Sequence, residues 1–343
     1  MHERIRHAHQ TPTFPNGFSV PHAVLVQAQR RFPVDRLVLL ASKRSVGKKY
    51  KYKGKTLSVE ELKQTSFKGI DIVLASAGGS VSKQFVPAAL KAGAVVIDNT
   101  SAYRMDPKVP LVVPEINAKD IFKHKGIIAN PNCCTIIMLV PIHAIHKKNR
   151  VQRMIVSTYQ SASGAGARAM KELESQAADV LAGRPAKKEV FPHQIAFNLF
   201  SHNSAVKDGG YNEEELKVIQ ETKKIFHDNK MKVTVTCVRV PVFRAHTESI
   251  YLELSKKPDV KKLRALLSDS PGIKIVDDAA RNYFPMPLEA TGGDDVLVGR
   301  LRLDPSNPKG LWLFVSGDQL RKGAALNAVQ IAEILISRHP EAR

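Results

Sequence analysis

Apolar segments alternate with amphipathic ones through the first third of the chain. Strands are predicted at three segments that are apolar almost throughout, residues 37–41, 70–75 and 94–97. Residues 81–92 carry apolar side chains at helical spacing and are followed by a glycine, so a helix is predicted there. Apolar strands joined by helices are typical of a parallel sheet that is covered on both faces. We therefore expect an α/β, doubly wound, dinucleotide-binding domain, whose ligands lie outside the carboxyl ends of its strands.

A basic segment follows the first predicted strand. Residues 48–55 read KKYKYKGK, and this alternation favours an exposed β-hairpin over a nucleic-acid site. Residues 59–63, directly after it, fit a short helix. The formal net charge of +20 would by itself suit nucleic-acid binding, but it would equally attract small polyanions such as phosphorylated substrates and dinucleotides.

Beyond residue 151 the pattern changes to long alternating strands with few helices between them. Strands are expected at 153–160, 233–243, 249–255, 296–303 and 311–316, and helices at 167–181, 213–227 and 322–337. A mostly antiparallel sheet and an α+β fold follow for this part of the chain. We predict a dinucleotide-binding domain over 1–130, a second domain over 131–319, and a terminal helix within 320–343 that returns to the first domain.

Length and composition agree with this division. The 343 residues are enough for two domains with separate cores. No apolar run approaches the roughly 20 residues of a membrane span. Cys133, Cys134 and Cys237 show neither metal-ligand spacing nor a disulfide framework, which suits a reducing compartment. We therefore expect a soluble cytoplasmic protein without a bound metal.

The segment Asn132-Cys133-Cys134-Thr135 carries candidate chemistry. It lies between two apolar runs, after an Asn-Pro pair, so the pattern predicts a strand, a tight turn and a helix with a cysteine in its first turn. There the positive end of the helix dipole favours a thiolate. A buried cysteine is more often an inert core residue, so this segment alone leaves both interpretations open.

Nine short segments carry a family resemblance. They are ASKRSVGKK (41–49), SAGGSVSK (76–83), DNTSAYRMD (98–106), VPLVVPEIN (109–117), NPNCCTI (130–136), TYQSASGAG (158–166), FPHQIAFN (191–198), RVPVFRAHTES (239–249) and DQLRKGAALNAVQIAE (318–333). Together they resemble the aspartate-β-semialdehyde dehydrogenase family. The match runs from about Phe32 to the C-terminus, and the segments are specific as a set.

This resemblance implies an NADP-dependent aldehyde dehydrogenase of the phosphorylating kind. The family reduces L-aspartyl-4-phosphate to L-aspartate 4-semialdehyde and phosphate through a cysteine thioester, in the biosynthesis of lysine, diaminopimelate, threonine and methionine. Such a reaction needs a thiolate, an acid/base group, cations for anionic groups and a positioned nicotinamide. The resemblance also implies that residues 131–319 form the catalytic and dimerisation domain of a homodimer.

The family pattern assigns roles to individual residues. By resemblance, Cys133 is the nucleophile and His246 is the acid/base group, whereas Cys134 stands where the family usually has a small residue and is interpreted as structural. Arg239 matches the clamp on the α-carboxylate, which a guanidinium binds in bidentate fashion. The other substrate-binding residues are Arg104 and Lys217 for the phosphate, Glu214 for the amino group, Gln160 for the bound intermediate, and Asn132. In the run EEELK, the pattern fits in two registers one residue apart.

The cofactor is predicted to be NADP. An acidic residue after the strand that ends near Ala41 would bind the ribose hydroxyls of NAD. This chain has Arg44 and Ser45 there instead, which suit a 2′-phosphate. The other cofactor-binding residues that we expect are Ser76, Gly78, Gly79, Ser163, Gly164 and Gln319.

The first 22 residues depart from the family. They contain no GxxGxxG loop, and Gly17 is the only glycine before Gly47. Backbone N–H groups of such a loop normally meet the pyrophosphate, so we expect NADPH to bind weakly to this chain.

Two alternatives to the main functional hypothesis stay open. One is another acyl-phosphate reductase, such as N-acetyl-glutamyl-phosphate reductase, although an acetylated amine has no charge for Glu214 to pair with. The other is a non-catalytic basic protein that binds nucleic acid, whose DNA binding would fall steeply with salt.

Overall fold

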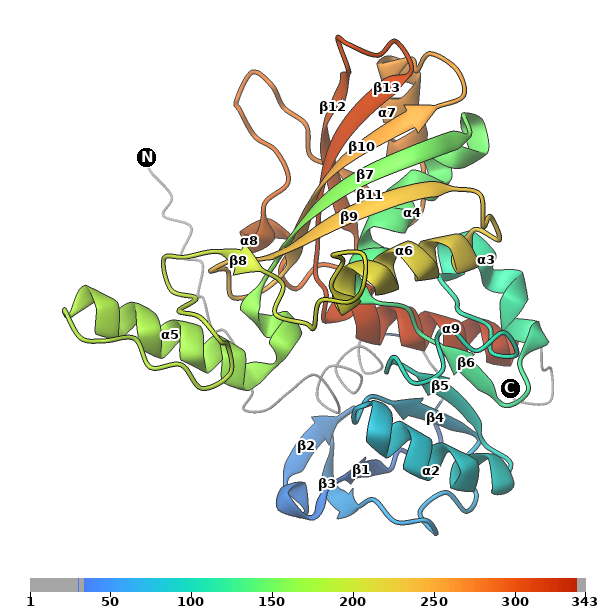
Figure 1. Ribbon diagram of the computed structural model, residues 1–343. Coiled ribbons are helices and arrows are strands. Elements are labelled where there is room, and N and C mark those ends of the chain that lie inside the picture. The colour runs from blue at the N-terminus through green and yellow to red at the C-terminus, as the bar shows by residue number, and fades with distance from the viewer. Residues whose placement is uncertain (1–29, 31–33, 338–343) are drawn as a thin grey trace, which may run out of the picture.

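The computed structural model describes residues 30 and 34–337, and in it a smaller domain and a larger domain are joined through the terminal helix (Figure 1). Residues 1–22, where the glycine-rich loop is missing, lie outside the described residues. Within the described part, no helix is long and apolar enough to cross a membrane. The smaller domain contains β1 (Leu39–Ala41), η1 (Lys43–Ser45), β2 (Lys49–Tyr52), β3 (Lys55–Glu61), β4 (Ile72–Ala75), α2 (Gly79–Lys91), β5 (Val95–Asp98), α3 (Pro114–Asn117), η2 (Ala118–Lys123) and β6 (Ile127–Ala129).

A three-stranded parallel sheet, ordered β4-β5-β6, lies at the centre of the smaller domain. Successive residues of a strand point to opposite faces, so Val96 packs with Val86 of α2 on one face. Ile97 packs on the other face with Ile331 of α9 (Leu326–Ser337). Because both faces are covered, the strands need apolar residues at nearly every position. This arrangement confirms the predicted α/β class.

The basic segment forms a hairpin of β2 and β3, as predicted. Its two turn residues both have positive φ, 44° at Lys53 and 80° at Gly54, as a type I′ turn requires. The helix predicted at 59–63 is wrong, because β3 continues to Glu61 and its residue Val59 pairs in parallel with β1. Pairing on both edges outweighs the weak helical preference of the local sequence.

The larger domain is built on one seven-stranded sheet, ordered β11-β12-β13-β10-β7-β9-β8. The pairs β7–β9 and β11–β12 are parallel and the other four pairs are antiparallel, which confirms a mostly antiparallel sheet. Its elements are α4 (Cys133–Lys148), β7 (Val151–Gln160), η3 (Ala162–Ala165), α5 (Ala167–Leu181), β8 (Phe200–Ser201), α6 (Glu213–Ile225), β9 (Lys232–Arg239), β10 (His246–Leu254), α7 (Val260–Ser268), β11 (Ile273–Ile275), α8 (Pro287–Ala290), β12 (Val296–Leu303) and β13 (Gly310–Gly317).

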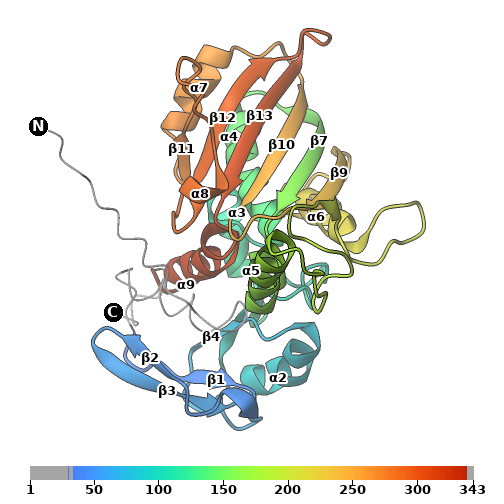
Figure 2. The same cartoon turned by 90° about the vertical axis from the view of Figure 1, so that its left-hand side faces the viewer.

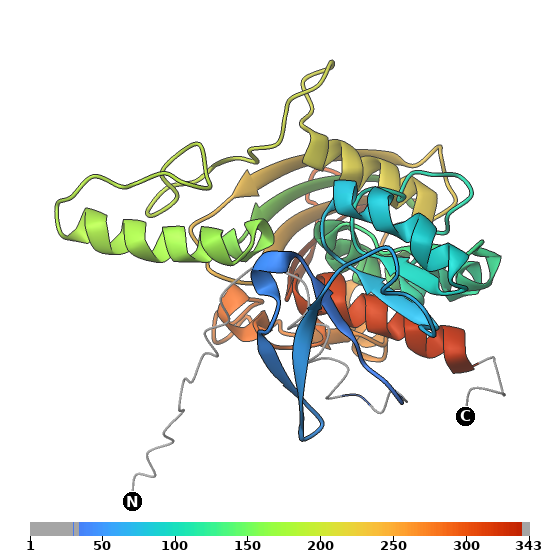
Figure 3. The same ribbon diagram turned by 90° about the horizontal axis from the view of Figure 1, so that it is seen from below.

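The helices α4, α6 and α7 lie on one face of this sheet, and the opposite face faces the viewer in Figure 2. Helix α4 is in contact with β10 and β13 on one side and with α6 and α7 on others. This position explains why nearly all of its residues from Cys134 to Ile142 are apolar and buried. Helix α5 instead projects from the body as an arm (Figures 1 and 3).

The predicted terminal helix does not begin as an α-helix. Residues Arg321–Ala325 form a π-helical turn, η4, and the α-helix α9 begins only at Leu326. The wider turn brings Gly323 against the nucleophile candidate: a Cβ at Gly323 would lie 3.1 Å from the Cβ of Cys133. Single π-helical turns are often found at functional sites for this kind of reason.

A buried lysine holds η4 to α3 of the smaller domain. The Nζ of Lys322 donates hydrogen bonds to Glu115 at 2.7 and 2.8 Å, to Asn327 at 3.1 Å and to Gln330 at 2.8 Å. The lysine is fully buried, so it is stable only because every one of its donors finds an acceptor.

We predict that Lys322→Met destabilises the protein by about 3 to 5 kcal/mol, because it leaves the largely buried Glu115 carboxylate without its ion-pair partner. Chemical denaturation measures this change. The matched control is Lys262→Met, which removes an exposed lysine 3.4 Å from Asp259 and should leave stability unchanged. Adding Glu115→Met to Lys322→Met should recover much of the loss. A Lys322→Met protein as stable as the original would contradict this account.

Candidate active site

Strand ends and helix starts meet at one place on the larger domain. β7 ends at Gln160, and its parallel neighbour β9 ends at Arg239, directly opposite Gln160. β10, which pairs with β7 on its other edge, begins at His246. The helix α4 begins at Cys133, and α6 has Glu214 in its first turn. The fold therefore gathers side chains from five separate segments.

Asn132 fixes the start of α4. Its side-chain oxygen accepts hydrogen bonds from the backbone N–H groups of Cys134 at 3.0 Å and Thr135 at 3.4 Å. This is the N-cap arrangement that asparagine favours. Cys133 is thereby held as the first helical residue, where the helix dipole stabilises negative charge.

The pKa values of the two neighbouring thiols are shifted in opposite directions. The sulfur atoms of Cys133 and Cys134 and a ring nitrogen of His246 all lie within 4.8 Å of one another. A hydrogen bond from Cys134, together with the interaction with His246, lowers the pKa of Cys133 well below its usual value even though burial opposes the shift. Burial and the same hydrogen bond raise the pKa of Cys134. The thiolate therefore forms on Cys133, and Cys134 serves it as a donor.

The orientation of His246 follows from its partners. Its Nδ1 lies 3.1 Å from the backbone N–H of Ser161 and 3.0 Å from the Ser161 hydroxyl. An amide N–H can only donate, so Nδ1 accepts and the neutral ring carries its proton on Nε2. Nε2 is buried and has no nitrogen or oxygen partner among the described residues. This proton is therefore available to a reacting group beside Cys133.

Glu214 is a buried carboxylate at the centre of the site. Its Oε1 accepts hydrogen bonds from the amide of Asn132 at 2.7 Å and from the amide of Gln160 at 3.3 Å. Its Oε2 lies 3.4 Å from the half-exposed Lys217. Burial raises its pKa, but His202, Lys217 and the Asn132 hydrogen bond outweigh burial and lower the pKa to about 2. Glu214 is thus ionised at neutral pH.

The structure distinguishes the three consecutive glutamates of α6. Glu213 is exposed and pairs with Lys207. Glu215 completes a capping box with Asn212 and accepts a hydrogen bond from the backbone of Cys237 at 3.0 Å. Glu214 alone of the three accepts hydrogen bonds from Asn132 and Gln160, and this geometry favours the register that places Glu214 in the site.

Arg104 lies beside the same cluster. It donates to Glu221 at 3.1 Å and to the backbone oxygen of Asn99 at 2.7 Å. The loop that carries it is held to α6 by Lys224, whose Nζ donates to the carbonyl oxygens of Arg104 and Asp106, both at 2.7 Å. The Nε of Arg104 is buried and unpaired within the described residues, so this guanidinium keeps a donor for an anion.

Arg239 is also buried and also keeps a donor. Its Nη1 donates to the backbone oxygen of Ser161 at 2.7 Å, and its Nη2 lies 2.8 Å from Nε2 of His202. The Nε has no partner in the described part of the chain. Gly164 borders this group, because a Cβ there would lie 3.1 Å from the His246 ring and 3.3 Å from Nη1 of Arg239. A glycine keeps that space open.

Gln319 and Ser163 lie next to the segment that carries His246. The Gln319 oxygen accepts a hydrogen bond from the backbone of Ala245 at 2.9 Å, and its amide is hydrogen bonded to Ser163. The Ser163 hydroxyl lies 3.0 Å from that of Ser161, the partner of His246. Three of the predicted cofactor-binding residues, Ser163, Gly164 and Gln319, are therefore grouped around His246.

The other predicted cofactor-binding residues lie on the smaller domain. Gly78 precedes α2 with a φ of 100°, a Cβ there would meet nothing within 4 Å, and the first turn of the helix has no side-chain cap. Such a helix start presents free N–H groups to an anion. Arg44 and Ser45 form η1 after β1, and Arg44 makes no ion pair within the described ranges. These features fit the phosphates of a dinucleotide.

One hydrogen-bonded chain connects the two groups of residues. Asn99 donates to the Ser76 hydroxyl at 3.3 Å and accepts from the Asn130 amide at 2.6 Å. Asn130 in turn lies two residues before Asn132 and accepts from Asn327 of α9 at 2.7 Å. The carboxyl ends of β4, β5 and β6 are thereby tied to the start of α4.

Comparison with known proteins adds to this geometry. Residues 23–124 match the family model for the semialdehyde dehydrogenase NAD binding domain, and residues 142–322 match the model for its dimerisation domain. An aspartate-semialdehyde dehydrogenase from Synechocystis is 53% identical over 311 residues, covering 91% of this chain and 92% of that protein. The chain belongs to the aspartate-semialdehyde dehydrogenase family.

The structural comparison agrees. The crystal structure of aspartate semialdehyde dehydrogenase II from Vibrio cholerae has a TM-score of 0.90 and 45% identity, covering 92% of this chain and 95% of that one. An aspartate-semialdehyde dehydrogenase from Aquifex aeolicus is 51% identical over 91% of this chain and 93% of its own length. The family resemblance found from short segments is thus confirmed over most of the chain.

Sequence reasoning missed several residues of this semialdehyde dehydrogenase site. Glu221 lies two helical turns after Glu214 on α6, so the helical period could have indicated it; it accepts from Arg104 and from the backbone of Asn132 at 2.6 Å. Burial raises its pKa. Glu248 is fully buried beside the two thiols, and burial raises its pKa well above the usual value. His202 carried no sequence signal.

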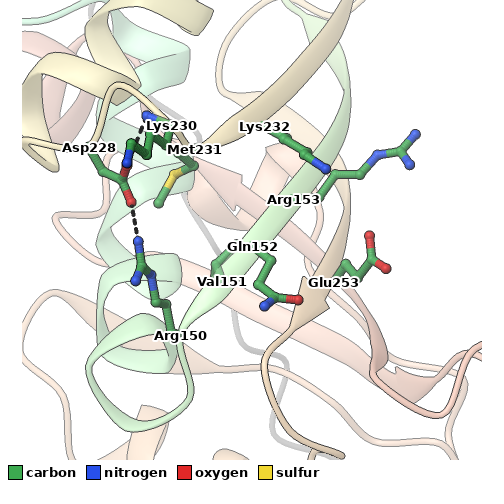
Figure 4. A pocket seen from close by; sticks show the side chains of 9 residues that line it. All are labelled: Arg150, Val151, Gln152, Arg153, Asp228, Lys230, Met231, Lys232 and Glu253. Atoms are coloured by element: carbon green, nitrogen blue, oxygen red, sulfur yellow. Dashed lines mark hydrogen bonds and ion pairs between the residues drawn. The ribbon is translucent and has the colours of Figure 1, made fainter.

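A separate cavity of about 390 Å³ lies at the opposite ends of the same strands (Figure 4). Val151 and Lys232, at the starts of β7 and β9, line it together with exposed charged side chains. Arg150 at its edge is paired with Asp228 at 2.9 Å. This cavity contains none of the predicted catalytic residues, so it is not the active site of the family.

We predict that iodoacetamide labels Cys133 before Cys134 or Cys237, with a pH midpoint below that of a free cysteine at about 8.5. Peptide mass spectrometry over a pH series measures this. Cys134→Ala should move the midpoint to higher pH because it removes the donor to the thiolate, whereas Cys134→Ser retains a donor. Cys237→Ala is the control and should change nothing. First labelling of Cys134 would overturn the assignment.

Proposed function

We propose that this chain catalyses the NADPH-dependent reduction of L-aspartyl-4-phosphate to L-aspartate 4-semialdehyde and phosphate. The observation that carries the proposal is the Cys133 thiol with a lowered pKa, adjacent to His246 and enclosed by oppositely charged buried groups, Glu214 and Arg239. The Vibrio cholerae relative has also been solved "complexed with ASA", and it shares 45% of its sequence with this chain.

Cys133 supplies the nucleophile. Its thiolate attacks the acyl carbon of the substrate, a C–S bond forms, the C–O bond to the phosphoryl group breaks, and phosphate leaves. The product is a thioester on Cys133. Asn132 and Gln160 hold the groups around this carbon, since each side-chain amide is anchored by Glu214.

His246 moves the proton. NADPH, when bound, supplies the hydride that reduces the thioester carbonyl. The Nε2–H of His246 donates a proton to the oxygen that becomes negative, and takes it back as the C–S bond breaks and the aldehyde forms. The Cys133 thiolate is then regenerated, and general acid/base help of this kind contributes about 10²- to 10⁴-fold.

The charged groups select an amino acid as substrate. Arg239 offers its unpaired Nε and its remaining Nη protons to the α-carboxylate, in the geometry that suits bidentate binding. Glu214 meets the ammonium group on the same carbon. Arg104 and Lys217 hold the phosphate, because both place a cation within the same cluster and Arg104 keeps an unpaired Nε.

The cofactor is NADP in this proposal. Arg44 and Ser45 hold the 2′-phosphate, Ser76, Gly78 and Gly79 face the phosphates at the start of α2, and Ser163, Gly164 and Gln319 face the nicotinamide. We further propose a cytoplasmic homodimer that contributes to lysine, threonine and methionine biosynthesis. The match to a dimerisation domain over 142–322 supports the dimer.

The test is NADPH formation from aspartate semialdehyde, NADP and phosphate, followed by absorbance. We predict turnover in the unaltered protein, none in Cys133→Ser, and a rate lower by about 10²- to 10⁴-fold in His246→Asn with an unchanged melting temperature. N-acetyl-glutamate semialdehyde should give no turnover. A His246→Asn protein with full rate and a lowered melting temperature would instead mean that His246 is structural.

A further inference from the structure

His202 stands between the two groups that are proposed to bind the charges of the substrate. It follows directly after β8, the edge strand that pairs with β9. Its backbone N–H donates to the carbonyl oxygen of Cys237 at 2.8 Å, so the residue is anchored to the same strand that ends in Arg239. The imidazole ring is turned to Arg239 on one side and to Ser204 on the other.

The protonation state of His202 is defined by Arg239. A guanidinium has only donors, so the contact of 2.8 Å between Nη2 and Nε2 requires Nε2 to accept. Nδ1 lies 3.1 Å from the Ser204 hydroxyl and 3.2 Å from the backbone N–H of Ser204, so this second ring nitrogen ties His202 to Ser204. Burial and the charge of Arg239 lower the pKa of His202 to about 4, although Glu214 opposes the shift. A neutral ring at physiological pH agrees with this geometry.

Ser204 extends the chain to α6. Its hydroxyl accepts from the backbone N–H of Glu214 at 3.1 Å and donates to Asn212 at 3.3 Å. Asn212 is the N-cap of α6 and also accepts from Glu215 at 3.0 Å. The series Arg239, His202, Ser204 and the first turn of α6 is continuous.

The spacing of these groups matters for binding. The substrate carries its carboxylate and its ammonium group on one carbon, so Arg239 and Glu214 must stand at a fixed distance and orientation. Arg239 extends from the end of a strand and Glu214 from the start of a helix, and the rest of α6 and nearly all of β9 separate them along the chain. A rigid bridge between them lowers the cost of ordering both side chains when substrate binds.

We propose that His202 is a positioning residue for substrate binding: by bridging Arg239 and Ser204, it sets the guanidinium that binds the α-carboxylate relative to the carboxylate that binds the amine. This inference rests on the proposed function, because it takes the roles of Arg239 and Glu214 from there. It goes further by assigning a part in substrate recognition to a histidine that is neither the nucleophile nor the acid/base group.

The experiment compares steady-state constants of four variants for aspartate semialdehyde and for phosphate. His202→Ala removes the bridge and should raise the KM for aspartate semialdehyde by at least about ten-fold, since hydrogen bonds to charged groups are among the stronger ones. The kcat should stay within about three-fold and the KM for phosphate within about two-fold, because Cys133, His246 and Arg104 are untouched. His202→Gln should stay close to the unaltered protein, since its amide can accept from Arg239 and donate to Ser204.

The matched control is His193→Ala. His193 lies in the same segment, with its ring 5.4 Å from that of Phe200, but it has no hydrogen bond to Arg239 among the described contacts. It should leave both KM values unchanged. Should His202→Ala fail to fold, Ser204→Ala tests the same bridge and should raise the same KM by a smaller factor.

Arg239→Lys separates the inference from the proposed function. An ammonium cannot reproduce the planar fork, so this variant should raise the KM for aspartate semialdehyde. If it does and His202→Ala does not, the positioning role of His202 is overturned while the proposed function stands. If neither variant changes that KM, the role of Arg239 itself is wrong. Equal changes in both KM values of His202→Ala, or no recovery in His202→Gln, would also contradict the inference.

Discussion

The site depends on the hydrogen bonds of one side chain, Asn132. Its oxygen caps α4 through the backbone of Cys134 at 3.0 Å, while its amide donates to Glu214 at 2.7 Å. Its own backbone N–H donates to Glu221 at 2.6 Å. The helix that begins at Cys133 is thereby locked to the helix that carries Glu214. A residue that only capped α4 would still place Cys133 at the start of a helix, but it would not fix the distance between Cys133 and Glu214.

Buried charge is tolerated here because each ion is met by fixed donors or acceptors. Glu214 has two amides and Lys217, and Arg239 has a carbonyl oxygen and His202. The exceptions are informative, since the buried Nε atoms of Arg104 and Arg239 find no partner within the described part of the chain. Unmatched buried donors cost stability, and a site for anions is where a protein accepts that cost.

Helices and strands were predicted correctly where the local sequence pattern and the tertiary contacts favour the same structure. The helix predicted at 167–181 is found as Ala167–Leu181, and the hairpin predicted from the alternation of residues 48–55 is formed by β2 and β3. The helix at 59–63 failed because β3 is paired on both edges, and the strand predicted at 233–243 ends at Arg239 because Pro241 lacks an N–H for the ladder. The positions of the predicted site residues followed from family segments, whereas His202 did not, since its contacts depend on an edge strand of two residues.

The measurement that tests the account most directly is a rapid-mixing experiment with aspartate semialdehyde and NADP in the absence of phosphate. Without phosphate to accept the acyl group, the reaction should stop at the thioester and give a burst of about one NADPH per active site. Mass spectrometry should then locate the aspartyl group on Cys133, and added phosphate should release it. The absence of a burst, or an acyl group on Cys134, would contradict the central claim that Cys133 forms the covalent intermediate.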